Sequence, residues 1–194
     1  REEIALVPGF YLDKQKKLKM GGTGGLMLSV SDGFGRIVGI QLRSTVKNAK
    51  FRYIWLSSAK QGGVLGGAPT GFLAGDDLRS DQIAITEGAL KGVVLRQHLN
   101  GIKGILHMAG VGMLSQLLER LEELQGVKKA LVCFDADWQE KPEVLAALAS
   151  LIRVLRSHGI AVEIRGWEIA KGKGIDDYLA NGHALADTYT VDAE

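Results

Sequence analysis

A regular alternation of short apolar runs and longer amphipathic segments over residues 83–164 constrains the fold more than any other feature of this sequence. Short apolar, β-favouring runs predict four strands, at 83–86, 104–107, 130–134 and 160–164. Apolar residues at helical spacing predict three helices, over about 88–99, 113–124 and 142–155. Strands that alternate with helices of this length indicate an α/β fold, a Rossmann-like parallel sheet flanked by helices.

The first 80 residues have a different pattern and charge. Two apolar runs with turn residues between them predict paired strands at 26–30 and 36–43, and 51–56 predicts a third. Residues 1–80 carry 12 Lys+Arg against 6 Asp+Glu, a balance of +6, and residues 81–194 carry 12 against 16, a balance of −4. We therefore expect a smaller basic α+β subdomain over 1–80 and the α/β domain over 81–194. A basic unit attracts polyanions and an acidic one can hold cations, although plain solvation of the charges is the simpler explanation.

Acidic residues follow two of the predicted strands. Asp135 and Asp137 come directly after 130–134, and Glu87 comes directly after 83–86. Ligands of an open α/β sheet bind at the carboxyl ends of its strands. If the first and third strands are neighbours, three carboxylates converge there, and a hard divalent cation would relieve their repulsion. The alternative is that Asp135 and Glu87 cap the helices that follow and that Asp137 is solvated.

Several classes of site and location are excluded or disfavoured by composition. The single cysteine, Cys133, rules out an internal disulfide framework and a cysteine-based zinc site, and it suits a reducing cytoplasm. The four histidines have no metal-ligand spacing, and no apolar run is long enough to span a membrane or to form a signal peptide. Because Arg1 is not an initiator methionine, we expect the chain to be a fragment of a longer protein.

Three sequence blocks resemble the Toprim domain, which bacterial-type DNA primases, topoisomerases and some nucleases share. The blocks are Ile83–Gly88, Leu131–Asp137 and Gly172–Leu179, and the resemblance covers roughly residues 80–182. The combination of Asp135–Trp138 with Lys173–Leu179 is most similar to primase-like Toprim proteins of phages, plasmids and other mobile elements.

The front half also resembles part of a primase. In bacterial replicative primases a basic α+β subdomain precedes the Toprim domain, and its hairpin and following basic segment are similar to Gly35–Gly39, Arg43 and Lys50–Ser58 here. This match favours a primase over a topoisomerase.

The resemblance implies a metal-dependent nucleotidyltransferase that makes short RNA or mixed primers on single-stranded DNA from nucleoside triphosphates, with a replicative helicase as a possible partner. It implies catalytic roles for three carboxylates, Glu87, Asp135 and Asp137. The implied ligands of Mg²⁺ or Mn²⁺ are these three with Asp176 and Asp177. The candidate nucleotide or DNA contacts are basic residues, Arg43, Lys50, Arg52, Lys60 and Lys173. Helix capping by Asp176 and Asp177, and plain solvation of the basic side chains, are the alternatives.

The sequence departs from the replicative-primase pattern at two places. Lys91 stands where those primases usually carry an acidic residue, and only Asp177 keeps the register of their last acidic element. Two other functions therefore stay open. One is a Toprim nuclease that hydrolyses phosphodiesters, and the other is a nucleic-acid-binding module with degenerate catalysis, for which Lys91 is the best argument.

Overall fold

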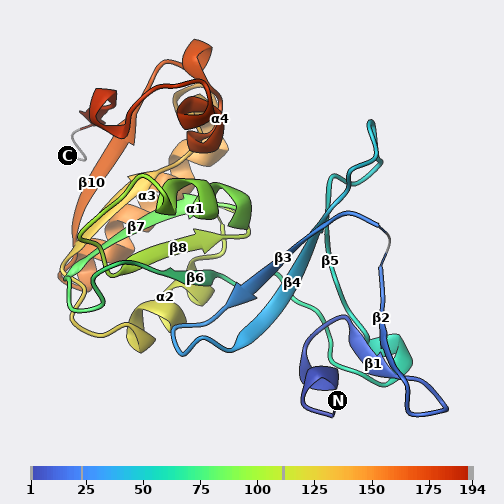
Figure 1. Ribbon diagram of the computed structural model, residues 1–194. Coiled ribbons are helices and arrows are strands. Elements are labelled where there is room, and N and C mark those ends of the chain that lie inside the picture. Colours follow the sequence, from blue (N-terminus) through green and yellow to red (C-terminus); the bar gives the residue numbers. More distant parts are fainter. Residues whose placement is uncertain (1, 23, 111, 192–194) are drawn as a thin grey trace. The chain divides into compact units, whose positions relative to one another are not determined.

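The computed structural model describes residues 2–22, 24–110 and 112–191 (Figure 1). The chain separates into two compact units, Arg1–Pro69 and Thr70–Glu194. The first is built mainly of strands and the second is a sheet flanked by helices.

The N-terminal unit consists of two antiparallel sheets, β1-β2 and β3-β4-β5. Its elements are η1 (Ile4–Leu6), β1 (Phe10–Leu12), β2 (Leu18–Met20), β3 (Leu26–Ser31), β4 (Ile37–Arg43), β5 (Tyr53–Trp55) and η2 (Ala59–Gln61). The three strands expected at 26–30, 36–43 and 51–56 are confirmed as β3, β4 and β5. We expected an α+β subdomain here, but the helical elements in the described part of this unit are the two 3-10 turns, η1 and η2. The reason is that no segment of the unit places apolar residues at helical spacing.

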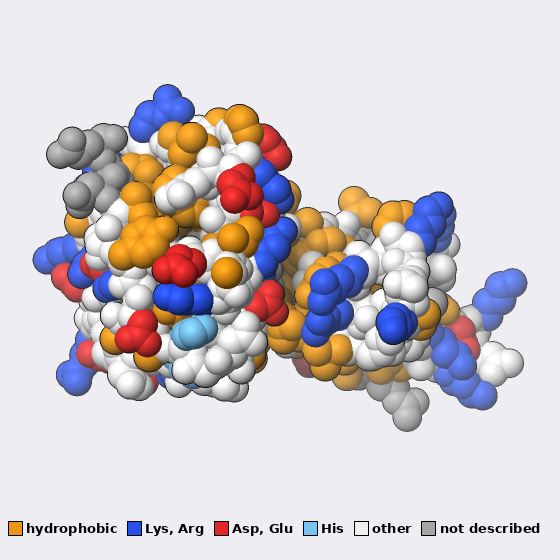
Figure 2. Space-filling model, turned by 90° about the horizontal axis from the view of Figure 1, so that it is seen from above, with side chains coloured by type: hydrophobic (Ala, Val, Ile, Leu, Met, Phe, Trp, Pro, Cys, Tyr) orange, Lys and Arg blue, Asp and Glu red, His pale blue; other side chains and the backbone are white. Residues whose placement is uncertain are grey.

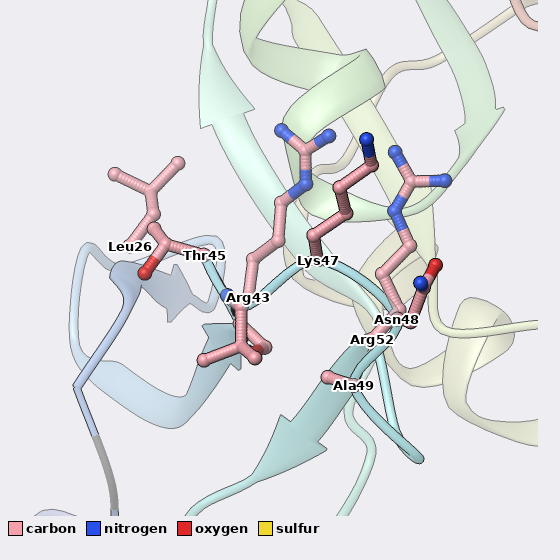
Figure 3. A pocket seen from close by; sticks show the side chains of 9 residues that line it. Leu26, Arg43, Thr45, Lys47, Asn48, Ala49 and Arg52 are labelled. Carbon is pink, nitrogen blue, oxygen red and sulfur yellow. Dashed lines mark hydrogen bonds between the residues drawn. The ribbon is translucent and has the colours of Figure 1, made fainter.

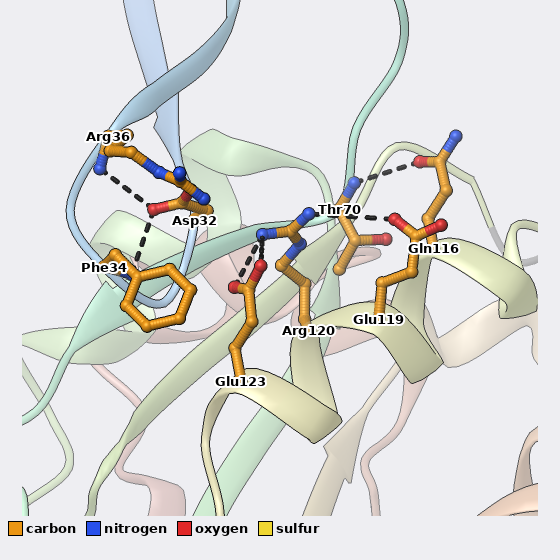
Figure 4. A network of polar contacts seen from close by, with 8 residues as sticks. All are labelled: Asp32, Phe34, Arg36, Thr70, Gln116, Glu119, Arg120 and Glu123. Carbon is orange, nitrogen blue, oxygen red and sulfur yellow. Dashed lines mark hydrogen bonds and ion pairs between the residues drawn. The ribbon is translucent and has the colours of Figure 1, made fainter.

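The turn between β3 and β4 is organised by Asp32, whose side chain is buried (Figure 4). Its carboxylate accepts hydrogen bonds from the backbone N–H groups of Phe34 and Arg36, both at 2.9 Å, and from Arg36 Nε at 2.6 Å. Burial alone would raise the pKa of Asp32, but the hydrogen bonds from Arg36 and Phe34 outweigh it and the pKa is lowered. The turn predicted at 31–35 is thus confirmed and is held by its own side chains.

The C-terminal unit contains a six-stranded mixed sheet of order β11-β10-β9-β7-β8-β6. The strands are β6 (Gly71–Ala74), β7 (Gln82–Glu87), β8 (Gly104–Met108), β9 (Lys129–Cys133), β10 (Ala161–Gly166) and β11 (Tyr189–Val191). The four central strands are the four that the sequence predicts, and they are mutually parallel. Strands β7 and β9 are neighbours, which is the condition for their acidic ends to meet.

Helices cover both faces of this sheet (Figure 1). They are α1 (Ala89–Arg96), α2 (Leu114–Glu123), α3 (Pro142–Ser157) and α4 (Ile175–Ala180), with 3-10 turns η3 (Ala136–Gln139), η4 (Ile169–Lys171) and η5 (Leu185–Asp187). Because side chains alternate along a strand, Ile83 and Ile85 pack with α2 and α3, whereas Ala84 packs with α1 and α4. None of the helices in the described ranges is both long and apolar enough to cross a bilayer.

The two edge strands, β6 and β11, pair antiparallel to their neighbours and are not predicted from the sequence. β6 lies in a glycine-rich stretch that suggests a loop, yet it pairs with β8 over its whole length. The N–H of Thr70 donates to Oε1 of Gln116 at 3.1 Å, which ties the start of β6 to α2 (Figure 4). Residues 70–80 therefore belong to the C-terminal unit, with Gly71–Ala74 in its sheet, and the chain divides after Pro69.

Candidate active site

The carboxyl ends of β7 and β9 are fixed to one another by a buried hydrogen bond. Thr86 pairs with Cys133 in the ladder, and its Oγ1 donates to the carbonyl of Cys133 at 2.9 Å. Glu87 is the last residue of β7, and the chain turns at once through Gly88, whose φ of 77° favours glycine. The N–H of Gly88 donates to the carbonyl of Met108 at 2.7 Å, so the position of Glu87 is set by bonds to both neighbouring strands.

The two aspartates that follow β9 lie in a short 3-10 turn. Asp135 is the N-cap residue of η3, but its side chain makes no capping hydrogen bond. Asp137 lies inside η3 and is only 6% exposed. The capping and solvation that the sequence left open are therefore not what these side chains do in this structure.

Lysine side chains neutralise both aspartates. Lys91 of α1 forms an ion pair and hydrogen bond with Oδ1 of Asp135. Nζ of Lys173 lies 3.0 Å from Oδ2 of Asp137 and 4.0 Å from Oδ2 of Asp135. Nζ of Lys141 lies 2.6 Å from Oδ2 of Asp137. The carboxyl edge is thus a cluster of alternating charges, and Figure 2 shows acidic and basic side chains intermixed on one face of the C-terminal unit.

The pKa values of Glu87 and Asp137 are shifted in opposite directions. Burial, followed by the negative charge of Asp135, raises the pKa of Glu87, while Lys91 partly opposes the shift. Burial alone would raise the pKa of Asp137, but its hydrogen bonds from Lys141 and Lys173 outweigh it, so the pKa is lowered. Neighbouring carboxyl groups held in such different protonation environments are typical of sites of acid–base chemistry.

The last acidic pair lies in the first turn of α4, and its two members differ. Neither Asp176 nor Asp177 caps the helix, whose N-cap is Gly174. Oδ1 of Asp176 is buried and has no hydrogen-bond partner among the described residues, whereas Asp177 is exposed. A hydrogen bond of 2.8 Å from the N–H of Ala136 to the carbonyl of Lys173 holds the loop before α4 against η3. A Cβ atom added at Gly174 would contact both Oδ1 of Asp176 and Oδ1 of Asp135, so Asp176 lies toward the aspartates that follow β9.

The donor chemistry of this edge fits a hard divalent cation, but the donors are not arranged around one. Its donors are carboxylate oxygens, which hard cations prefer. The Lys173 ammonium group lies between Asp135 and Asp137, so these two carboxylates already hold a positive charge between them. Within the described ranges, however, no three acidic, histidine or cysteine side chains are grouped so as to hold a metal ion. A cation that binds both aspartates would have to displace Lys173 and compete with Lys141, which lies closer to the same oxygen of Asp137.

A second cluster of positive charge lies in the N-terminal unit, around the loop between β4 and β5 (Figure 3). Arg43, Lys47 and Arg52 line a pocket of about 620 Å³ together with polar and apolar residues, and their side chains project to the same side of the loop. Arg43 also lies over the ring of Tyr53, at 6.0 Å. In the part of the chain that the structure describes, none of these three cations forms an ion pair. We call this site the basic pocket.

The structure divides the expected nucleotide-contacting residues into separate groups. Arg43 and Arg52 share the basic pocket, but Lys60 lines a different cavity of about 270 Å³ beside Trp55, and Lys50 lines neither. Sequence reasoning missed Lys47 in this pocket and the pairing of Lys141 with Asp137. Their sequence signals are weak: Lys47 is one of many lysines in a basic half, and Lys141 merely follows Asp137 by four residues.

Comparison with solved structures places this fold among bacterial primase catalytic domains. The chain is similar to a DNA primase domain from Pseudomonas aeruginosa, with 18% identity, a TM-score of 0.63, and coverage of 97% of this chain and 55% of that one. It is also similar to the RNA polymerase domain of the Mycobacterium tuberculosis primase DnaG in complex with double-stranded DNA, with 15% identity, a TM-score of 0.62, and coverage of 95% and 56%. The third is the Aquifex aeolicus primase (zinc-binding and RNA polymerase domains), with 14% identity, a TM-score of 0.60, and coverage of 94% of this chain and 45% of that one. The chain spans about half the length of these structures, and the likeness is one of fold.

Residues 78–185 match the model of a family described as "Domain of unknown function (DUF3854)", and the chain belongs to that family. No curated protein matches the sequence.

Proposed function

We propose that the C-terminal unit is a Toprim domain and that the chain is a primase-like nucleotidyltransferase, which synthesises short primers on single-stranded DNA. The observation that carries the proposal is the pairing of β7 with β9, because it brings Glu87 to the same sheet edge as Asp135 and Asp137. The fold shared with bacterial primase domains supports it.

In the proposed reaction, a primer 3′-hydroxyl attacks the α-phosphorus of a nucleoside triphosphate. A new oxygen–phosphorus bond forms, the bond from the α-phosphorus to the bridging oxygen breaks, and pyrophosphate leaves. Glu87 accepts the proton of the hydroxyl. Its burial favours this role, since a raised pKa makes a carboxylate a better base than it is in water.

Asp135 and Asp137 would hold Mg²⁺ or Mn²⁺, with Asp176 as a further oxygen donor because its Oδ1 is otherwise without a partner among the described residues. When bound, the ion neutralises charge on the triphosphate. Lys173 would then leave the aspartates. Since its side chain is 53% exposed, it is free to contact phosphate instead.

The basic pocket would hold the template backbone or the incoming triphosphate. Its arginines suit this role because a guanidinium can bind phosphate with two parallel hydrogen bonds. Lys47 joins Arg43 and Arg52 in the pocket, while Lys50 and Lys60 would make weaker, peripheral contacts. A cytoplasmic setting, an origin in mobile elements and work beside a replicative helicase complete the proposal and rest on the sequence resemblance.

The proposal is tested by primer synthesis on single-stranded DNA of mixed sequence, with labelled nucleotides and Mg²⁺ or Mn²⁺. The variant Asp135→Asn, Asp137→Asn keeps the shape of both side chains and removes their charge. We expect it to lose about 10³-fold in synthesis, since metal-mediated charge stabilisation contributes several kcal/mol. Glu122→Gln is the matched control, because Glu122 is an exposed carboxylate on α2.

Three results would contradict the proposal. Degradation of the template without synthesis would identify a nuclease that uses the same carboxylates. Salt-dependent DNA binding without any turnover, unaffected by the double variant, would identify a binding module. Equal loss in Glu122→Gln and in the double variant would show that the assay reports stability rather than chemistry.

A further inference from the structure

The tip of the β1–β2 hairpin is a turn that the N-terminal unit uses twice. In the first copy, Oδ1 of Asp13 accepts hydrogen bonds from the N–H groups of Gln15 and Lys17, both at 2.9 Å. The carbonyl of Asp13 accepts a further bond from the N–H of Lys16 at 2.9 Å. In the second copy, Asp32 makes the same three bonds at the matching positions between β3 and β4. The two turns therefore have the same hydrogen-bond pattern.

The two copies differ at the position that has a left-handed backbone. In the Asp32 turn this position is Gly35, with a φ of 79°, and in the Asp13 turn it is Lys16, with a φ of 58°. A Cβ atom makes this backbone unfavourable, and asparagine, as at Asn48, tolerates it better than lysine does. A lysine needed only for solubility could stand at any other exposed position. The strain therefore indicates a use for the Lys16 side chain.

Lys16 is part of a compact group of positive charges at this tip. Lys14, Lys16 and Lys17 are exposed, and none of the three forms an ion pair within the ranges that the structure describes. The acidic residue of the tip, Asp13, is engaged by two backbone N–H groups and lies 3.9 Å from Nζ of Lys19. The tip is thus a basic projection with a fixed backbone, open to an anion.

The residue types at the tip fit the phosphate groups of a nucleic acid duplex. Lysine contacts phosphate as a point charge, without the paired hydrogen bonds through which arginine reads a guanine edge. Residues 13–19 include no arginine and no aromatic residue, so the tip has no ring on which an unstacked base could lie. Binding through charge alone favours a duplex, which carries twice as many phosphates per unit length as one of its strands.

The basic pocket has the opposite composition and lies at the other end of the N-terminal unit (Figure 1). Two of its cations are Arg43 and Arg52, and Arg43 lies over the ring of Tyr53, which is 39% exposed. The ring of Phe51, next to Arg52 in the chain, is 60% exposed. Exposed rings beside guanidinium groups suit a single strand, whose bases are free to stack. The unit therefore has two basic sites of different chemistry.

We propose that the β1–β2 hairpin is a second nucleic-acid contact, in which Lys14, Lys16 and Lys17 bind the phosphate backbone of a duplex in preference to a single strand. Contacts of this kind do not depend on base sequence. In the proposed reaction the duplex is the new primer paired with its template, and for that identity the inference rests on the proposed function. The hairpin would hold this product on the protein between successive additions.

The test measures binding of a short labelled DNA duplex and of one of its strands by fluorescence anisotropy, at several salt concentrations and without metal or nucleotide. In the variant Lys14→Gln, Lys16→Gln, Lys17→Gln we expect the duplex slope of log K against log salt to fall by about 2.7, about 0.9 for each lost phosphate contact. Between about 50 and 200 mM salt, the wild-type chain should then lose about 40-fold more duplex affinity than the variant. The single-strand slope should change by less than about 1. Lys128→Gln is the matched control, because Lys128 is an exposed lysine of the C-terminal unit.

Two single variants separate charge from strain. Lys16→Gly removes one charge and the unfavourable Cβ contact, so we expect a duplex slope lower by about 1 and a melting temperature at or above the wild-type value. Lys14→Gly removes one charge where φ is not positive, so it should lower the slope equally and also lower the melting temperature. Because Lys16→Gly keeps the fold, it tests the contact even if the triple variant does not fold.

An unchanged duplex slope in the folded triple variant or in Lys16→Gly would overturn the inference, and so would an equal fall for duplex and single strand. A lower melting temperature for Lys16→Gly than for Lys14→Gly would refute the argument from strain. Primer synthesis is a separate readout. Duplex binding through the hairpin without any synthesis would keep this inference and remove the proposed function, while synthesis with unaltered duplex binding in the triple variant would do the reverse.

Discussion

Replacing Thr86 by valine tests whether one buried hydrogen bond holds the two acidic strand ends together. Valine keeps the branched shape of threonine but cannot donate to the carbonyl of Cys133. The side chain is fully buried, so no water can replace the lost donor without opening the sheet. Because Glu87 is the next residue along β7, any loosening is passed directly to the candidate base.

The expected loss of stability is about 1–2 kcal/mol, the contribution of a buried hydrogen bond and of the carbonyl lone pair left without its donor. In a domain of this size that corresponds to a fall in melting temperature of about 4 °C for each kcal/mol. Thr86→Ser keeps the donor and removes one buried methyl group, which also costs about 1 kcal/mol. The two variants therefore lose similar stability but differ in the hydrogen bond.

Primer synthesis distinguishes them. We expect Thr86→Val to lose up to about 10²-fold in rate, since a misplacement of about 1 Å at a catalytic group can have that effect, and Thr86→Ser to stay near the wild-type rate. Thermal unfolding of the same two variants verifies that they lose similar stability. The reasoning fails if valine leaves the melting temperature unchanged, or if serine and valine lose activity equally.

Three further predictions concern charge. Glu87→Gln should stabilise the fold at pH 7 and abolish synthesis. Because the pKa of Glu87 is raised in the fold, the wild-type carboxylate destabilises the protein increasingly as pH rises from about 4.5 and has no such effect at lower pH. Urea unfolding of both proteins at several pH values measures this difference. Asp137→Asn should remove stability that the wild-type chain has at neutral pH and loses as pH falls below about 3.8, because the pKa of Asp137 is lowered in the fold; equal acid sensitivity of the two proteins would contradict this. Arg43→Ala and Arg52→Ala should each reduce the slope of log K for single-stranded DNA against log salt by about 1, and Lys50→Ala by less, as fluorescence anisotropy would show.

The central sheet could be predicted from the sequence because its signals are local. The predicted strands are short apolar runs, which include Ile83, Ile85, Leu131 and Val132, and they alternate with segments whose apolar residues recur at helical spacing. Each run is a strand whose ends lie within one or two residues of the predicted ones. The edge strands β6 and β11 could not be predicted in the same way. Both are short, and each is a strand because it pairs with a strand elsewhere in the chain, β6 with β8 and β11 with β10.

The meeting of Glu87, Asp135 and Asp137 at one edge of the sheet followed from the sequence, whereas the burial of Asp176 rather than Asp177 and the basic side of the candidate site did not. The position of a carboxylate at a strand end depends on the strand, which the sequence reveals. The pairing of Lys91 with Asp135 joins residues 44 apart and depends on how α1 and η3 pack, which no spacing encodes. Likewise Lys50 and Lys60 are near Arg52 in the sequence, but neither lines the basic pocket.

The single thiol of the chain gives the β7–β9 edge a chemical reporter. Cys133 is buried beneath this edge, and burial raises its pKa to about 12, so that at neutral pH it is both inaccessible and un-ionised. Its side chain packs on the face of the sheet that α1 and α4 cover, so a maleimide or iodoacetamide can modify it only when these helices move away from the sheet. The rate of alkylation, followed by mass spectrometry without any added label, would measure how often α1 and α4 uncover this end of β9, and nucleotide or metal that binds at the acidic cluster should slow it.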